Sequence, residues 1–272
     1  RVLFRSAMER MIVTTFGTDA EAQRGVSALK DLNASGDITL YGVVVLGKDV
    51  SGKVTVRLGS GEIVEGTSTG LLTSAMLGLI AGPARMGTDT SLDALSGMLF
   101  ELSQAGVDVR FAARVSDELR PGTVVVVASA DEDWTVPVDT RMAALGGVVF
   151  RQPITNVIED QDARDAAVLS AQSDALKAEL EAVGERARSE LQKSIDRVKA
   201  DVRQKEVEIE LRVDQAAREA DAKLAAVKAQ FATANAQTRA RLAHRFACVS
   251  GSLDARGARL KQAADLVKQA RL

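Results

Sequence analysis

The chain has 272 residues, which is enough for one or two domains. Its 35 Lys and Arg residues nearly balance its 37 Asp and Glu residues, which argues against a basic nucleic-acid-binding protein. One His and one Cys exclude a disulfide framework, a dithiol redox pair and a His- or Cys-rich metal site within one chain. We therefore expect no cofactor, and nucleic acid is not an expected partner.

The composition changes near residue 154. All four prolines and 18 of the 21 glycines precede residue 155, whereas the remainder is rich in alanine and charged residues. The expected parts are an α+β domain over residues 8–154, a boundary between Ile154 and Asp162, and a helical coiled-coil tail over residues 159–272. Residues 1–6 resemble a translated sequencing adapter, so we expect the native chain to begin at Met8 or Met11.

The start of the α+β domain has the pattern strand–helix–strand–strand. Apolar, β-branched runs predict the strands, and polar turn residues separate the second run from the third. The expected strands are 11–16, 38–46 and 53–58. Thr18-x-x-Glu21 is a capping box that begins a helix, and Gly36 is its expected end. This order is half of a ferredoxin-like unit.

A Gly-rich helical insert follows the third strand. Small residues recur every four positions and form one stripe, which lets another backbone approach closely. The stripe consists of Gly66, Gly70, Ser74, Gly78 and Gly82. It predicts either a helix packed closely on the sheet or a glycine zipper that self-associates or inserts into a membrane. The uncharged run over 71–82 is too short to span a bilayer alone, which favours the packed helix.

The elements after the insert complete the predicted domain. They are helices over 89–105 and 108–119, a strand over 123–128, a short helix beginning near Pro137, and a strand over 148–151. The last strand–helix–strand supplies the second half of the ferredoxin-like unit. We expect a four- or five-stranded sheet with helices on one face.

Residues 11–153 resemble the bacterial and archaeal domain-of-unknown-function family 1269, whose members are often labelled uncharacterised membrane proteins. The resemblance rests on the opening strand, Leu40-Tyr41-Gly42-Val43-Val44-Val45 leading into Gly52-Lys53-Val54, the Gly-rich helix, Arg120-Pro121-Gly122-Thr123, Glu132-Asp133-Trp134-Thr135-Val136-Pro137-Val138-Asp139 and Leu145-Gly146-Gly147-Val148-Val149-Phe150-Arg151. The Gly-rich segment of this chain is shorter and less apolar than is usual in the family. The family has no established activity, so the resemblance implies no catalytic residues.

Apolar positions in the tail are spaced by four, three and four residues, an 11-residue repeat. This period predicts a nearly straight or slightly right-handed coiled coil. The expected core residues are Ile209, Val213, Leu224, Val227, Phe231, Leu242, Phe246, Val249, Leu253 and Leu260. Two polar residues in the same series, Asn235 and Thr238, either set the register or mark a weak point.

Charge is distributed unevenly along the tail. Residues 159–210 carry 14 acidic and 9 basic side chains, whereas residues 211–272 carry 5 acidic and 12 basic ones. Three explanations are open: the two parts pair as an antiparallel hairpin, the basic part contacts anionic lipid or nucleic acid, or the charges are solvated and have no partner. A long amphipathic helix cannot bury its apolar stripe alone, so the tail must fold back or form a homo-oligomer. Possible breaks are Gly184, Gly251 and Gly257.

Motifs that could support catalysis or metal binding are weak. His244 and Cys248 are four residues apart on a helix, but they lack the further ligands that a metal requires. The Gly-rich segments 59–61 and 66–70 match no phosphate-binding loop. The acidic residues around Trp134 could act as acid–base groups or hold a hard cation, or Asp133 could simply cap the Pro137 helix. They are Asp131, Glu132, Asp133 and Asp139.

These observations predict a non-enzymatic, cytoplasmic assembly or scaffolding protein. In this interpretation an α+β head carries a helical tail that drives self-association. The alternative is a peripheral or inserted membrane-associated protein, which would use the Gly66–Gly82 helix and the basic tail.

Overall fold

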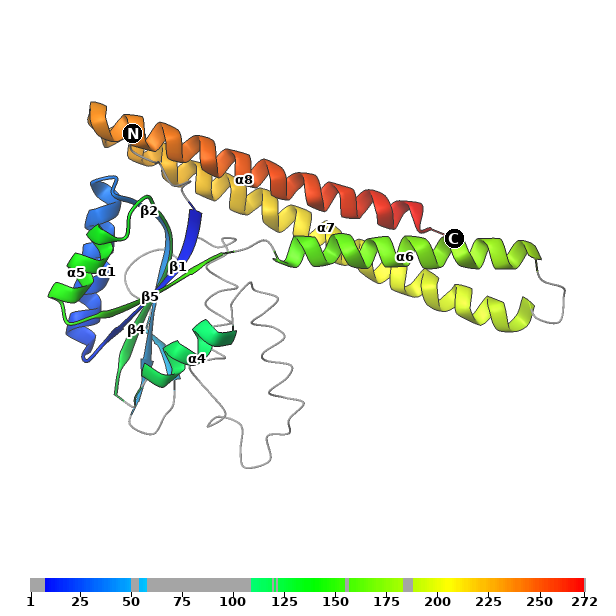
Figure 1. The fold of residues 1–272 in the computed structure, drawn as a ribbon, viewed down its shortest axis with the longest axis horizontal. Helices are drawn as coiled ribbons and strands as arrows, with labels where there is room; N and C mark the ends of the chain where they lie inside the picture. The colour runs from blue at the N-terminus through cyan, green and yellow to red at the C-terminus, as the bar shows by residue number, and fades with distance from the viewer. Residues whose placement is uncertain are drawn as a thin grey trace. The chain divides into compact units, whose positions relative to one another are not determined.

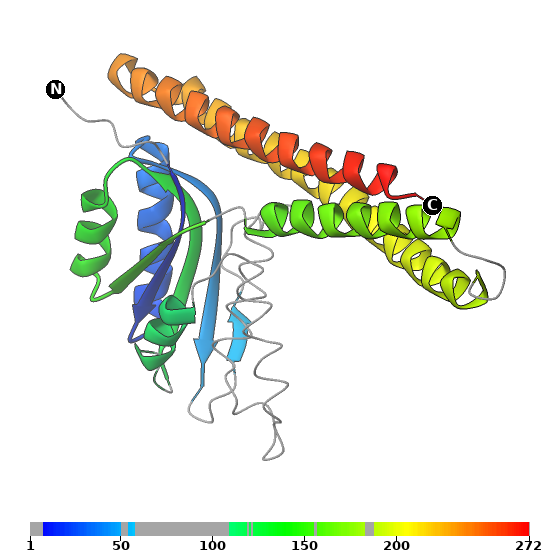
Figure 2. The ribbon, with the colours of Figure 1, turned by 45° about the vertical axis from the view of Figure 1, so that its right-hand side comes forward.

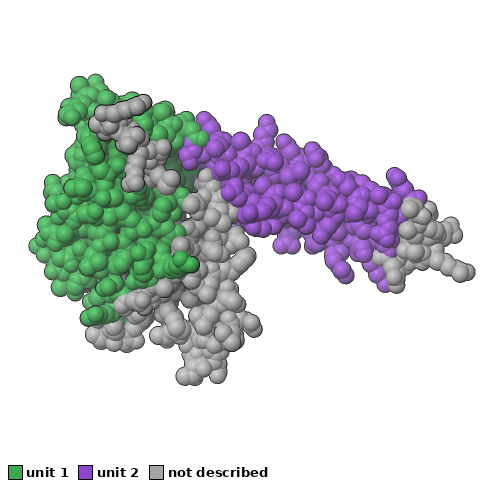
Figure 3. Space-filling view, in the orientation of Figure 1, with its two compact units in different colours: residues 1–155, 219–251 green, residues 156–218, 252–272 purple. Residues whose placement is uncertain are grey.

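The structure, a computed structural model, describes residues 8–49, 54–57, 109–118, 120, 122–154, 157–182 and 188–271. These residues form an α+β fold, with one five-stranded sheet and several helices (Figure 1). The chain divides into two compact units (Figure 3). Unit 1 comprises residues 1–155 and 219–251, and unit 2 comprises residues 156–218 and 252–272. The first division falls within the predicted boundary region, but the tail contributes to both units.

The sheet of unit 1 contains the described strands in the order β3-β2-β4-β1-β5, and all neighbouring strands are antiparallel. The strands are β1 (Met8–Phe16), β2 (Ile38–Lys48), β3 (Val54–Arg57), β4 (Val124–Glu132) and β5 (Val148–Pro153). All nine residues of β4 are buried, as expected for a valine-rich central strand covered on both faces. The predicted sheet is therefore confirmed.

One face of the sheet packs against α1 (Asp19–Ala34) and α5 (Val136–Ala144) (Figure 2). The principal core residues there are Ile12, Phe16, Val26, Leu29, Val126 and Met142. The predicted capping box begins α1, because the Glu21 amide donates to Thr18 Oγ1 at 3.2 Å. Gly36 ends this helix with a φ of +75°, a conformation that glycine adopts without steric cost.

The other face of the sheet is also in contact with helices, which the sequence did not predict. Residues 219–251 of unit 1 belong to α7 (Arg188–Thr233) and α8 (Ala236–Gln269), and their side chains bond to β1 and β2. The expectation of helices on a single face is therefore wrong. The strand β4 also extends to Glu132, because residues 130–132 pair with residues 8–10 of β1.

The described residues of unit 2 lie mainly in helices, to which α6 (Val157–Ala182), α7 and α8 each contribute. Small and medium-sized apolar side chains form its core. The buried ones are Ala166, Val202, Ile209, Ala263, Val267 and Ala270.

The break between α7 and α8 lies at residues 234–235 rather than at a glycine. Asn235 is exposed and accepts a hydrogen bond from the Thr238 amide at 2.9 Å, so it caps α8. Its predicted place in the core series is therefore wrong, because a side-chain cap begins a new helix here. Gly251 and Gly257 lie inside α8, and Gly184 lies outside the described residues.

The Gly66–Gly82 stripe, the predicted helix over 89–105 and the Gly-rich loop over 59–61 lie outside the described residues. Among the helices that the structure does describe, none combines the length and apolarity needed to cross a membrane.

Candidate functional site

The second face of the sheet carries polar side chains at one end. Side chains alternate between the faces of a strand, so Glu9, Ser129 and Asp131 point away from the apolar core. Glu9 and Asp131 are direct partners across β1 and β4. On the neighbouring strand, a register shift between Leu40 and Gly42 marks a bulge at Tyr41. The Tyr41 hydroxyl donates a hydrogen bond to Asp131 Oδ2.

Lys223 of α7 approaches these carboxylates. Its Nζ lies 2.5 Å from Glu9 Oε2 and 2.5 Å from Glu219 Oε1, and it lies over the Tyr41 ring at 5.5 Å from the centroid. Ser129 Oγ donates to the other Glu9 oxygen at 2.6 Å. Burial alone would lower the pKa of Lys223, but the carboxylates of Glu9 and Glu219 outweigh it and raise that pKa. Lys223 is therefore held as a buried cation.

Arg245 of α8 is a second buried cation, with 0% of its surface exposed. Its guanidinium donates to Thr39 Oγ1 at 2.9 Å and to Asp133 Oδ2 at 2.7 Å. Thr39 Oγ1 in turn donates to Gln230 Oε1 at 2.6 Å, and Gln230 Nε2 donates to the Ile38 carbonyl at 2.8 Å. These bonds connect both helices to β2.

We call this set the polar seam. It consists of Glu9, Thr39, Tyr41, Ser129 and Asp131 on the sheet and Glu219, Lys223, Gln230 and Arg245 on the helices.

Burial raises the pKa of Asp131 to about 6, and Glu9 adds to the shift, whereas the Tyr41 hydroxyl, Arg245 and Lys223 oppose it. Burial and the adjacent Asp131 also raise the pKa of Tyr41, which stays protonated as the donor. Lys223 pairs with Glu9 and Glu219, and Arg245 pairs with Asp133 next to the seam, so we interpret the seam as an attachment of residues 219–251 to the sheet.

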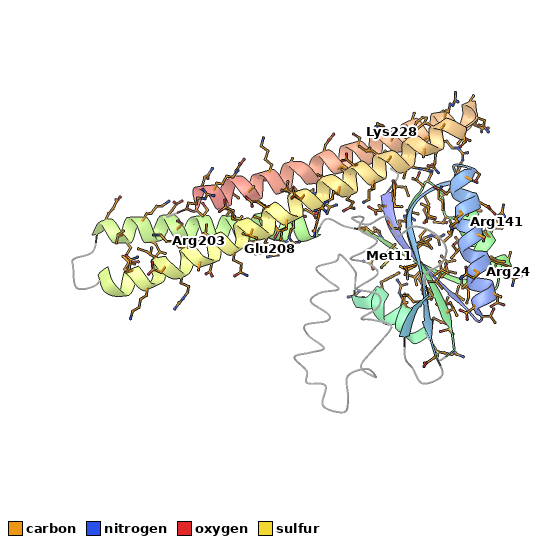
Figure 4. The ribbon with its side chains drawn as sticks, turned by 180° about the vertical axis from the view of Figure 1, so that it is seen from behind. Met11, Arg24, Arg141, Arg203, Glu208 and Lys228 are labelled. Carbon is orange, nitrogen blue, oxygen red and sulfur yellow. The ribbon has the colours of Figure 1, made fainter. Side chains whose placement is uncertain are left out.

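A different surface is exposed on α7 within unit 2. Val207 and Leu211 lie one helical turn apart, and each is 57% exposed. Figure 4 labels Arg203 and Glu208 on the same helix. Isolated apolar side chains are common on surfaces, but two large aliphatic residues on one helix face are suited to contact with another protein.

Ion pairs in unit 2 join the acidic and basic parts of the tail. Asp162 of α6 pairs with Arg212 at 2.9 Å and with Lys205 at 2.8 Å. Asp160 pairs with Arg259 at 3.1 Å, and Glu159 also pairs with an arginine of α8. The uneven charge seen in the sequence is therefore partly matched within this chain.

The acidic residues around Trp134 do not form one site. Asp131 and Glu132 are consecutive strand residues, so they lie on opposite faces of the sheet. Glu132 pairs with Arg151 at 2.6 Å, as Asp139 also does. Asp133 pairs with Arg245, and α5 begins after Thr135 without a side-chain cap.

The predicted coiled-coil residues are mostly covered. Ile209, Val227, Leu242, Val249 and Leu260 are buried, and Leu224, Phe231, Phe246 and Leu253 are partly buried. Val213 is 41% exposed, because the neighbouring Arg212 takes the inward position and bonds to Asp162. His244 and Cys248 are partly buried, with Sγ 3.9 Å from the ring nitrogens. Among the described residues, no three His, Cys, Asp or Glu side chains are grouped to hold a metal.

Sequence reasoning missed the polar seam. Between residues 219 and 233 of α7, the buried positions are Glu219, Lys223, Val227 and Gln230. Val227 belongs to the apolar series that the 11-residue repeat selects, and each of the three polar residues lies one position before a member of that series. The available signal was the Glu219–Lys223 pair, four residues apart and adjoining that series. Such pairs usually lie on solvated helix faces, so the pattern alone did not indicate burial.

Comparisons with known proteins found no matching family model, curated protein or solved structure.

Proposed function

We propose that the chain is a non-enzymatic assembly or scaffolding protein that associates with copies of itself through α7. The observation that carries this proposal is the pair of exposed aliphatic residues, Val207 and Leu211. Burying such side chains against a second copy removes apolar surface from water, which stabilises association. The paired charges of the polar seam support a structural role for unit 1.

The proposal includes two finer structural assignments. The order β5-β1-β4-β2, with α1 and α5 on one face, is that expected of a ferredoxin-like unit, in which β3 is an additional edge strand. We also assign the buried and partly buried apolar series of α7 and α8 to a coiled coil with an 11-residue repeat.

The sharpest test compares matched Val→Glu substitutions in the full chain. We expect Val207→Glu, alone and combined with Leu211→Glu, to weaken self-association at least about tenfold, because a charge would enter the contact. Val168→Glu is the control, since Val168 on α6 is 56% exposed and of the same residue type. Sedimentation equilibrium measures the mass at several concentrations, and circular dichroism checks the helix content. A wild-type chain that stays monomeric at every concentration contradicts the proposal.

The membrane-associated alternative stays a prediction. It rests on the Gly66–Gly82 helix and on the basic part of the tail. Arg212, Arg245 and Arg259 of that part form ion pairs with acidic residues of this chain, so these cations are already neutralised, which argues against lipid binding. Flotation with anionic but not neutral vesicles, lost at high salt, would support the alternative.

A further inference from the structure

The exposed face of α7 in unit 2 extends beyond its two aliphatic residues. Side chains at intervals of three or four residues share one side of a helix, and those around Val207 and Leu211 are exposed. In order they are Ala200, Arg203, Val207, Leu211, Asp214 and Arg218. We call these six residues the α7 stripe. Its centre is aliphatic, and its nearest charges are a cation on one side and an anion on the other.

The two nearest charges have no counterpart within the described part of this chain. Arg203 lies one turn before Val207, and Asp214 lies about one turn after Leu211. Neither side chain forms an ion pair with any residue that the structure describes, in contrast to Lys205, Glu208 and Arg212 nearby. The stripe therefore places an unmatched cation and an unmatched anion on the two sides of its aliphatic centre, 11 residues or three helical turns apart, and a second cation, Arg218, lies at its end.

This arrangement distinguishes between the two ways of pairing identical helices. Parallel pairing in register places each charge beside the same charge of the other copy, which is unfavourable. Antiparallel pairing reverses one helix, so Arg203 meets the partner's Asp214, and symmetry repeats the contact at the other end. The same reversal places Val207 beside the partner's Leu211.

We infer that two copies of this chain pair through antiparallel α7 stripes, with a two-fold axis between Val207 and Leu211 and an Arg203–Asp214 ion pair on each side. The inference rests on the proposed self-association and adds its surface, orientation and register. Aliphatic contact provides the attraction, and the two ion pairs select the orientation. Because the stripe is narrow, the association is weak and depends on concentration.

A charge-reversal series in the full chain tests the orientation. Arg203→Asp places Asp opposite Asp, and Asp214→Arg places Arg opposite Arg, so each single change should weaken the dimer about tenfold. The combined variant restores opposite charges and should recover the wild-type dissociation constant within about threefold. Arg197→Asp is the matched control, because Arg197 is exposed on α7 outside the stripe. Sedimentation equilibrium over roughly 1–200 µM covers weak association.

The outcomes separate this inference from the function on which it rests. If the single reversals leave the dimer unchanged while Val207→Glu weakens it, α7 mediates association but the antiparallel register is wrong. If the combined variant is weaker than both single variants, the Arg203–Asp214 contact is absent. A wild-type monomer overturns both the register and the proposed function. In 1 M NaCl the effect of each single reversal should shrink, because salt screens exposed charges.

Discussion

Residues 219–233 of α7 bury charged and amide side chains, whereas residues 203–214 of the same helix leave large aliphatic side chains in solvent. The first segment holds Lys223 between two carboxylates and directs Gln230 toward the sheet. The second exposes Val207 and Leu211. The contrast teaches that the residue types on one helix do not by themselves identify its buried face.

The two segments also differ in the consequences of substitution. A buried charge costs several kcal/mol if its partner is removed, because neither water nor another ion replaces the lost contact. An exposed aliphatic side chain contributes little to folding, so its replacement alters association rather than stability. Folding and self-association can therefore be perturbed separately in α7.

The largest expected effect is that of Lys223→Met. The substitution keeps the length of the side chain but removes the cation that the buried Glu219 and the partly buried Glu9 share, so the free energy of unfolding should fall by about 3–5 kcal/mol. Urea denaturation of the full chain measures this change. The matched control is Lys228→Met, since Lys228 is exposed on the same helix (Figure 4). Equal effects of the two substitutions would contradict the role assigned to Lys223.

A second prediction concerns the pH dependence of the polar seam. Burial raises the pKa of Asp131 to about 6, above its ordinary value of 3.8, so the folded state binds this proton more tightly than the unfolded state. The bound proton therefore contributes its full share to the free energy of unfolding below pH 3.8, and this contribution is lost as the pH rises through 6. Relative to Asp131→Asn, the wild-type free energy of unfolding should fall by about 2 kcal/mol between pH 4 and pH 7.

This pH dependence is measured by urea denaturation of both proteins in matched buffers. Asp31→Asn is the control, since Asp31 is exposed on α1 and lies outside the seam. Besides Tyr41, the ionisable groups facing Asp131 are Glu9, Arg245 and Lys223. If the free energy of unfolding of the wild type and of Asp131→Asn changed in parallel with pH, Asp131 would have the same pKa in the folded and unfolded states, which would contradict this prediction.

Local signals in the sequence predicted much of the fold. The Thr18–Glu21 capping box, the end of α1 at Gly36 and the valine-rich β4 are encoded by short patterns, and the structure contains all three. Such patterns provide hydrogen-bond partners for backbone groups or bury a strand, and they depend little on residues far away in the sequence. They were therefore accessible without tertiary information.

The polar seam could not be predicted because it is assembled from distant parts of the sequence. Glu9 and Lys223 are 214 residues apart, and Thr39 and Arg245 are 206 apart. Each of these polar residues is compatible with a solvated surface when it is considered alone. The bulge at Tyr41 also changes the register of β2 locally, and the residue types around Tyr41 do not predict a bulge.

The smallest effect is expected at the turn between the two helices, where Asn235 is exposed and no buried charge is involved. Replacing Asn235 by Ala removes the acceptor for the Thr238 amide, so the free energy of unfolding should fall by about 1 kcal/mol. Asn235→Asp keeps an acceptor oxygen and should retain the wild-type stability, whereas Gln237→Ala controls for an exposed change in the first turn. Urea denaturation compares the three variants. If Asn235→Ala is neutral, packing of the buried Thr238 against Gly36, rather than the cap, determines where α8 begins. The contrast with Lys223→Met would then be larger still, because the Asn235 side chain would contribute no measurable stability.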